Sequence, residues 1–122
     1  MKKPAILDVN GKQYTFLFNN RSLAMMERSI GRSILSILSG NQYSILKDMT
    51  IDVTAAGIKY GLQDIGEKDP YDVIDEICDG GRLIDDINGT IMEAWFNTGI
   101  FIKWAGAETA EPKTSRSRKA SK

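Results

Sequence analysis

Carboxylates and one cysteine are the residues in this 122-residue sequence whose types and spacing most suggest chemistry. There is no histidine, so general acid–base catalysis would fall to carboxylates, lysines or Cys78. Asp72, Asp75, Glu76 and Asp79 recur at spacings of three and four residues, which places them on one face of a helix. A divalent cation could bind there, but no ligand loop accompanies them. We therefore interpret them as a solvated acidic face.

Cys78 has no histidine to activate it as a nucleophile, so we interpret it as a small apolar residue on a helix face. A single cysteine cannot form an internal disulfide, which is typical of a reducing compartment. The sequence contains neither a GxxxxGK[ST] phosphate loop nor metal-binding spacings of cysteine and histidine. We predict a protein that is not an enzyme and that uses no metal or other cofactor.

Net charge is zero, but the charges are unevenly distributed along the chain. Residues 105–122 contain five cations and two carboxylates and have no large apolar residue, which predicts a flexible basic tail. The tail could contact phosphates, yet it has no aromatic residue to stack on a base, so we favour a solvated tail over a nucleic-acid arm. No apolar run approaches the ~20 residues that span a bilayer.

A β-hairpin is predicted over residues 5–18, because Asn10-Gly11 separates two segments with strand-like alternation at Ile6, Asp8, Tyr14, Phe16 and Phe18. A hairpin alone is marginal in water, so it must pack on other elements. Those elements are helices over about residues 21–97. Residues 22–38 fit one helix or two, and we favour two, with Gly31 ending the first and Ser33 capping the second.

The later helices are predicted from their apolar faces and from residues that typically begin or end a helix. Residues 43–64 contain one or two helices, and the helix from Ile51, whose apolar stripe starts with that residue, is apolar on two sides, which suits the centre of a bundle. Gly57 and Gly61 either admit a neighbouring helix there or weaken this one. Pro70 begins and Gly80 ends the next helix. The last helix covers about residues 82–97, Asn88-Gly89 is a point where it could bend, and its expected apolar stripe comprises Leu83, Ile84, Ile87, Ile91, Ala94 and Trp95.

The predicted fold class is therefore α+β and mainly α. An N-terminal hairpin packs on a bundle of four to five helices within a single folded domain, residues 1–104. Residues 105–122 form the tail.

Several large apolar residues fall outside these stripes. They either form a second layer of the protein's own core or present a binding surface. Glu27, inside an apolar stripe, should pair with Arg28, Arg32 or a backbone group, rim a groove, or be partly exposed. The candidate partner-binding residues are Met25, Leu35, Met92, Phe96, Ile100, Phe101 and Trp104.

A family resemblance is carried by "NGKQYTFLF", "NNRSLAMMERSIGRSILSIL", "TAAGIKYGLQD" and "DPYDVIDEICDGGRLIDDINGTIMEAWF". Over about residues 5–100 the chain resembles the tail assembly chaperones of long-tailed bacteriophages. The resemblance depends mainly on the positions of hydrophobic residues and includes no catalytic motif. Its best-matched residues are Leu23, Glu27, Gly31, Ser33, Ile34, Ile37 and Leu38.

The resemblance implies a non-enzymatic protein that binds the tape measure protein, keeps it soluble and helps to recruit tail tube subunits. It also implies self-association, action in the cytoplasm of the infected host, and absence from the mature virion. Two alternatives stay open. One is a nucleic-acid-binding regulator with a helix-turn-helix around Gly31 and a basic tail, and the other is a minor structural component of the tail.

Overall fold

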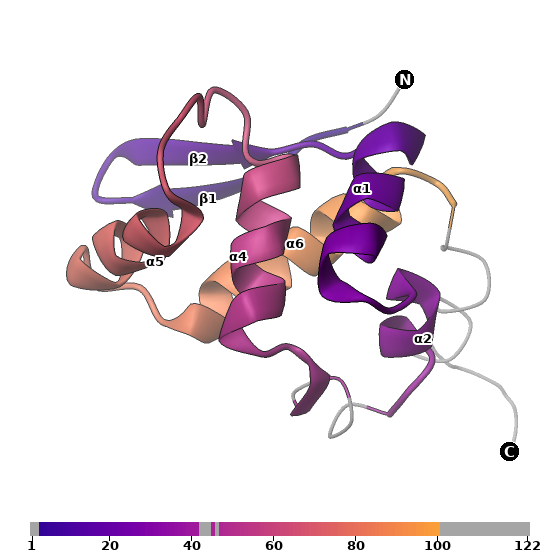
Figure 1. Cartoon of the computed structure of the whole chain (residues 1–122). Helices are drawn as coiled ribbons and strands as arrows, with labels where there is room; N and C mark the ends of the chain where they lie inside the picture. Colours follow the sequence, from indigo (N-terminus) through magenta and orange to yellow (C-terminus); the bar gives the residue numbers. More distant parts are fainter. Residues whose placement is uncertain (1–2, 42–44, 46, 101–122) are drawn as a thin grey trace, which may run out of the picture.

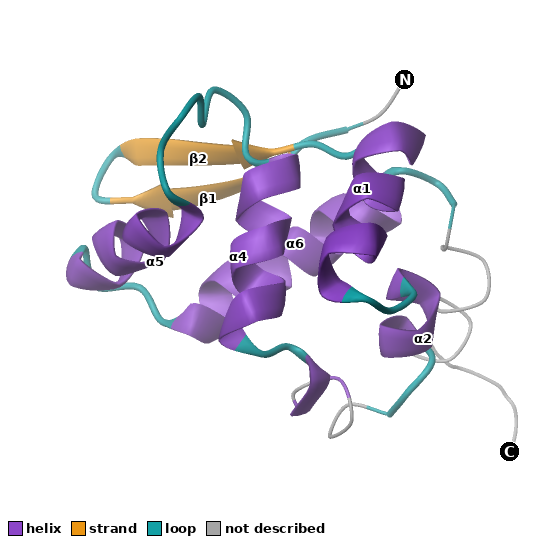
Figure 2. Cartoon of the chain, in the orientation of Figure 1, coloured by secondary structure: helices purple, strands orange, loops and turns teal. Residues whose placement is uncertain are grey.

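A two-stranded hairpin packs on five helices in the computed structural model, which describes residues 3–41, 45 and 47–100 (Figure 1). The strands are β1 (Ala5–Val9) and β2 (Lys12–Phe16). The helices are α1 (Asn20–Ile30), α2 (Ile34–Leu38), α4 (Ile51–Gly61), α5 (Pro70–Asp79) and α6 (Ile84–Asn97). The predicted α+β class with a mainly helical bundle is confirmed (Figure 2). The predicted tail, residues 105–122, lies outside the described residues.

The hairpin turns at Asn10 and Gly11, whose φ angles of 53° and 90° suit the tight turn expected from this residue pair. The strands are antiparallel, with Leu7 opposite Tyr14. Both of these residues are buried. The sequence pattern grouped Ile6 with the aromatic residues of the second strand, but Ile6 is exposed. Its neighbours Ala5 and Leu7 are buried instead, because successive side chains of a strand point to opposite faces of the sheet.

The outer edge of β2 is joined to the end of α4. The Leu17 N–H donates to the Gly61 carbonyl at 2.9 Å, and the Gln63 N–H donates to the Thr15 carbonyl at 2.8 Å. These bonds satisfy backbone groups that a free strand edge would leave unpaired. They explain how a two-stranded sheet is held against the helices.

Residues 20–38 form two helices, as predicted. The Asn19 side chain accepts a hydrogen bond from the Ser22 N–H and begins α1, and Gly31 ends it with a φ of 73°. Ser33 then caps α2 by accepting from the Ser36 N–H. The left-handed backbone at Gly31 turns the chain, and this conformation favours glycine.

Helix α4 lies between α1 and α5 in Figure 1, with α6 crossing behind it. The prediction of a central helix is confirmed, although Ile51 at its start is exposed. Two glycines of α4 allow side chains of neighbouring elements to approach its backbone closely. A Cβ at Gly57 would lie 2.7 Å from Ile91 Cδ1, and one at Gly61 would lie 2.4 Å from Phe18 Cζ.

Helix α5 begins at Pro70 after the Asp69 cap and ends at Gly80, as predicted. Helix α6 starts later than expected, at Ile84, so Leu83 lies before the helix and is 67% exposed instead of joining the apolar stripe. The Leu83 N–H donates to the Asp86 carboxylate at 2.9 Å, which fixes the start of the helix.

The interior of α6 also differs from the sequence pattern. Thr90, which is not part of the expected apolar stripe, is buried, and its hydroxyl donates to the Asp86 carbonyl at 2.9 Å. Asn88 is buried and accepts a hydrogen bond from the Thr54 hydroxyl of α4. Helix α6 runs continuously through Asn88 and Gly89, the point where a bend was expected. No helix in the described part of the chain is long and apolar enough to cross a membrane.

Candidate functional site

The residues that carry the family resemblance form one structural unit, consisting of α1, the turn at Gly31 and α2. Leu23 points into the core from α1. Gly31 and Ser33 provide the helix end and the helix start. Three residues of α2 are buried, namely Ile34, Ile37 and Leu38. The residues that match the family therefore either connect α1 to α2 or pack these two helices against the core.

Glu27 joins the two helices directly. Its Oε2 accepts a hydrogen bond from the Ile34 N–H at 2.8 Å, and its side chain is half-buried. The carboxylate thus caps the first turn of α2, where backbone N–H groups lack helical partners. Among the alternatives left open by the sequence, pairing with a backbone group and partial exposure are both observed.

The predicted partner-binding residues separate into three groups. Met25 on α1, Leu35 on α2 and Ile100 after α6 have 42%, 48% and 51% of their surface exposed. Met92 and Phe96 are half-buried and pack against the core. Phe101 and Trp104 lie outside the described residues. The described structure therefore exposes apolar side chains on the adjacent helices α1 and α2, and it gives Met92 and Phe96 contacts within the protein.

Other exposed apolar residues were missed from the sequence. Ile6, Ile51, Tyr71 and Leu83 are each about half or more exposed. The sequence pattern assigned three of them, all but Tyr71, to strand or helix stripes. A periodic pattern identifies a face but does not show where the neighbouring element ends. Their exposure could be found only from the packing.

A groove lies between the end of α1, one side of α4 and the segment leading into α5, with a volume of about 660 Å³. Tyr60 and Tyr71 line it, together with Ala55 and Ala56 of α4. The Tyr71 hydroxyl donates to Asp52 Oδ1 at 2.8 Å, and this hydrogen bond raises the pKa of Tyr71 above its ordinary value. The groove brings together segments far apart in the sequence, so no local motif indicated it.

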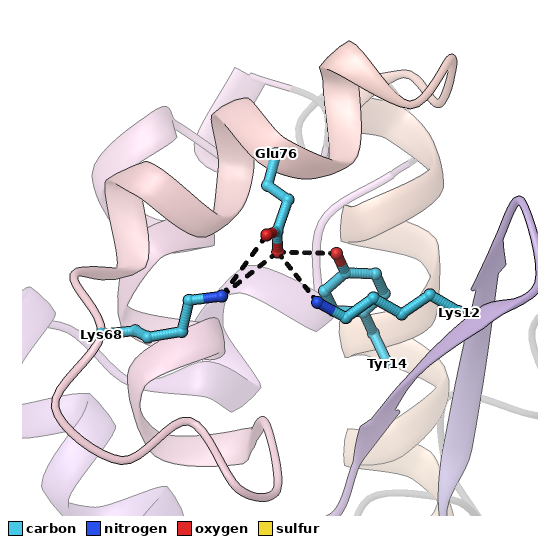
Figure 3. Close-up of polar contacts among 4 residues, drawn as sticks. All are labelled: Lys12, Tyr14, Lys68 and Glu76. Atoms are coloured by element: carbon cyan, nitrogen blue, oxygen red, sulfur yellow. Dashed lines mark hydrogen bonds and ion pairs between the residues drawn. The ribbon is translucent and has the colours of Figure 1, made fainter.

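A polar cluster ties the hairpin to α5 (Figure 3). Glu76 Oε1 accepts a hydrogen bond from the buried Tyr14 hydroxyl at 2.7 Å. Lys12 and Lys68 each place their Nζ 3.4 Å from the same carboxylate oxygen. Burial, followed by the hydrogen bond to Glu76, raises the pKa of Tyr14 to about 12. The Tyr14 hydrogen bond and the two lysines lower the pKa of Glu76.

This cluster changes the interpretation of the acidic helix face. Glu76 is exposed, as are Asp72, Asp75 and Asp79, but it is also bound to the hairpin. Within the described ranges, no group of three or more side chains is placed to hold a metal ion. Cys78 is a free thiol and is exposed on the same helix. Glu76 therefore has a structural role that the spacing alone did not reveal.

Helix α2 offers little for reading DNA. It has five residues, with the sequence ILSIL, and so spans about 7.5 Å. Its exposed residues are Leu35 and Ser36, whereas base recognition in the major groove uses several polar side chains from one helix. The turn at Gly31 has the connectivity that a helix-turn-helix requires, but its second helix lacks the side chains for base recognition.

Comparison with known proteins gives no match. No family model, curated protein sequence or solved structure matches this chain. Function must therefore be argued from the residues and their placement.

Proposed function

We propose that this protein is a phage tail assembly chaperone that binds the tape measure protein, keeps it soluble and helps to recruit tail tube subunits. In this role it acts without catalysis in the cytoplasm of the infected host and is absent from the mature virion. The proposal starts from the resemblance of residues 5–100 to that family. The hairpin-then-helices order of the described residues agrees with the resemblance.

The observation that carries the proposal is the exposure of Met25 and Leu35 on consecutive helices whose other apolar residues are buried or partly buried. Leu23 and Met26 complete the inner side of α1, and Ile34 and Ile37 complete that of α2. Met25 and Leu35 therefore add nothing to these inner faces. A contiguous apolar patch rimmed by polar residues is typical of surfaces that accept an amphipathic helix, and we assign Met25 and Leu35 to such a patch.

Binding of a long helical client requires such a surface and no reacting groups. Methionine suits it because its unbranched side chain adapts to different partners. Removing two apolar side chains from such a surface should weaken client binding, while the stability of the chaperone changes little.

The experiment is co-expression with a candidate tape measure protein, followed by gel filtration. The native chain should raise the soluble fraction of the client and elute with it. The Met25→Ser/Leu35→Ser variant should elute with much less client. A matched control, Ile6→Ser/Leu83→Ser, removes two exposed apolar side chains elsewhere on the surface and should keep the complex.

Two results would oppose the proposal. If the native chain leaves the client insoluble and no complex survives gel filtration, the protein is not a chaperone for that client. If the chain is found in purified phage particles, it is a structural tail component instead. An unchanged complex with the Met25→Ser/Leu35→Ser variant would place the binding surface outside α1 and α2.

A further inference from the structure

The groove between α4 and the start of α5 combines buried apolar residues with exposed carboxylates. Ala55 and Ala56 of α4 are buried in its lining, whereas Asp52, Glu67 and Asp69 are exposed there. Its volume of about 660 Å³ lies within the range of clefts that bind ligands. An apolar surface bordered by carboxylates favours a chain segment that carries cations.

The three carboxylates keep acceptor capacity for an added cation. Asp52 accepts from the Tyr71 hydroxyl at 2.8 Å and Asp69 accepts from the Tyr71 N–H at 2.9 Å, each through its Oδ1 atom. An ionised carboxylate has two oxygens and about four acceptor sites, so further donors can be bound. Neither these two aspartates nor Glu67 forms an ion pair with any residue that the structure describes.

The two lysines in the lining of the groove already have partners. Lys68 Nζ lies 3.4 Å from the Glu76 carboxylate, and Lys59 Nζ lies 5.4 Å from the centroid of the Tyr60 ring. Tyr71 is 48% exposed, and within the described ranges no cation lies over its ring. A ring held beside carboxylates suits a guanidinium group, which stacks on aromatic faces and pairs with carboxylates.

One segment of the sequence complements this groove in charge. Residues 113–122 contain five cations and no carboxylate, whereas residues 64–79, from the groove to the end of α5, contain seven carboxylates and one lysine. Two of the five cations are arginines, Arg116 and Arg118, and Pro112 precedes them. Aromatic-lined grooves bind proline-containing segments, because such segments lose little conformational entropy on binding. Residues 112–119 therefore offer a proline to the tyrosines and cations to the carboxylates.

The segment is tethered within reach of the groove. Pro112 follows Ile100, the last described residue, by twelve positions. A flexible linker of this length averages about 20 Å between its ends and extends to about 40 Å. A domain of about 100 residues has a radius of gyration of only about 13 Å. The tether also gives the segment an effective concentration of about 1 mM at the groove.

We propose that residues 112–119 bind in the groove between α4 and α5 of the same chain and cover it. A dissociation constant near the effective concentration of about 1 mM leaves the groove covered about half of the time. Salt weakens the contact, because exposed ion pairs are screened. A partner that binds this groove must displace the segment. The proposal is independent of the chaperone role, since neither Met25 nor Leu35 lines the groove.

Paramagnetic relaxation in the full chain measures this contact. Cys78 is the only cysteine and is exposed on α5, about 10.5 Å along the helix from Tyr71, so a nitroxide attached to it lies near the groove but outside it. In low salt, the amide signals of residues 112–119 should lose about half of their intensity. They should regain it in about 0.5 M salt.

A mixed sample separates contact within one molecule from contact between two. It combines nitroxide-labelled chain with unlabelled chain enriched in ¹⁵N, so that only contact between molecules weakens the observed signals. In dilute solution the mixture should keep the full intensity of residues 112–119.

A groove variant and a matched control locate the binding surface. Glu67→Lys/Tyr71→Ala removes a carboxylate and a ring from the groove and should restore most of the lost intensity. Glu93→Lys/Leu83→Ala makes the same change of charge and also removes an exposed apolar side chain, but on other elements. This control should behave like the native chain. Dispersion of the amide signals shows that each variant is folded.

A third variant changes the segment alone and leaves every described residue native. Lys113→Ala/Arg116→Ala/Arg118→Ala should restore the intensity of the segment. It should also move the amide signals of Glu67 and Tyr71 to their positions in the native chain at high salt, because both measures report an empty groove.

Three results would overturn the proposal. Equal intensities in low and high salt show that the segment is not bound. A loss of intensity that persists in Glu67→Lys/Tyr71→Ala places the segment on another surface, such as the outer face of α5. A loss in the mixed sample shows that the segment binds a second molecule. None of these outcomes affects the tape measure experiment, which depends on Met25 and Leu35.

Discussion

The centre of the molecule and its outer helices share one apolar core but differ in how tightly they are packed and in how exposed their polar contacts are. Around α4, side chains fill the space so closely that glycine is required where Ile91 and Phe18 approach. The outer helices α1, α2 and α5 also bury apolar residues in this core, and polar contacts such as Glu27 with Ile34 and Glu76 with Tyr14 join them to neighbouring elements. Substitutions at the centre should therefore change stability through volume. Those at the periphery should act through single hydrogen bonds and leave exposed apolar residues free for partners.

The largest effect is expected at the centre, for Ile91→Ala. Ile91 is fully buried where α6 packs on α4, so the variant should lose about 3 kcal/mol in the free energy of unfolding from lost burial and a residual cavity. Urea denaturation measures this. Met25→Ala is the control and should change stability by less than about 0.5 kcal/mol, because Met25 is exposed. If both variants lost the same free energy of unfolding, packing at the centre would not matter more for stability than contacts at the surface.

Close packing at the centre predicts opposite effects for two glycines. Gly61→Ala places a Cβ 2.4 Å from the ring of the buried Phe18, so we expect a loss of about 2 kcal/mol despite the better helix propensity. Gly89→Ala meets nothing within 4 Å and should raise stability by up to about 1 kcal/mol. Thermal unfolding of both variants checks the pair, and a stabilised Gly61→Ala would contradict the close contact.

At the periphery, Glu27→Ala should cost about 1.5 kcal/mol, because it removes a charged acceptor from the Ile34 N–H. Hydrogen exchange should show the Ile34 amide losing protection before the amides of α4. Glu93→Ala is a matched control, since Glu93 is exposed on α6 and makes no ion pair in the described structure. If both changes are equally mild, the link between α1 and α2 does not depend on the carboxylate.

The smallest of these effects is expected for Tyr14→Phe, at about 1 kcal/mol near neutral pH, from loss of the hydroxyl that donates to Glu76. The pKa of Glu76 is lowered in the folded protein, so the contribution of this carboxylate is present above its unfolded pKa and is lost as pH falls through the folded value. The difference between native chain and variant should therefore shrink in acid.

The raised pKa of Tyr14 predicts the opposite behaviour at high pH. With a folded pKa of about 12 against 10.0 for the free side chain, the contribution of Tyr14 is complete below pH 10 and is lost as pH rises towards 12. Urea titrations across pH measure both limits. Tyr71→Phe is the control, because its hydrogen bond to Asp52 is exposed and should be worth less. A difference that stays constant with pH would show that Glu76 does not stabilise Tyr14.

Much of the fold was predictable because its signals are local. Asn10-Gly11 specifies a tight turn, Ser33 and Asp69 specify helix starts, and Gly31 specifies a helix end, each through its own backbone or side chain. The expected close approach at Gly57 and Gly61 also followed from residue type, although not the identity of the neighbours. These features depend on a few adjacent residues, which the sequence supplies directly.

The candidate site was less predictable, since exposure depends on the surroundings of a face. Met25 and Leu35 fell outside the stripes and are exposed, but Met92 and Phe96 fell outside them too and pack on the core. Leu83 lay within a stripe and is exposed. Helical periodicity gives the direction of a side chain, whereas the position of the neighbouring element decides whether anything covers it.

By itself the sequence determined the order of the elements, most of their boundaries and the uneven distribution of charge along the chain, because these follow from local conformation and from composition. Only the tertiary structure decided that Glu27 caps α2, that Glu76 joins α5 to the hairpin and that Asn88 bonds to Thr54. Each of these contacts joins different elements of the fold. A polar side chain finds its partner only after the chain has brought distant segments within hydrogen-bonding distance.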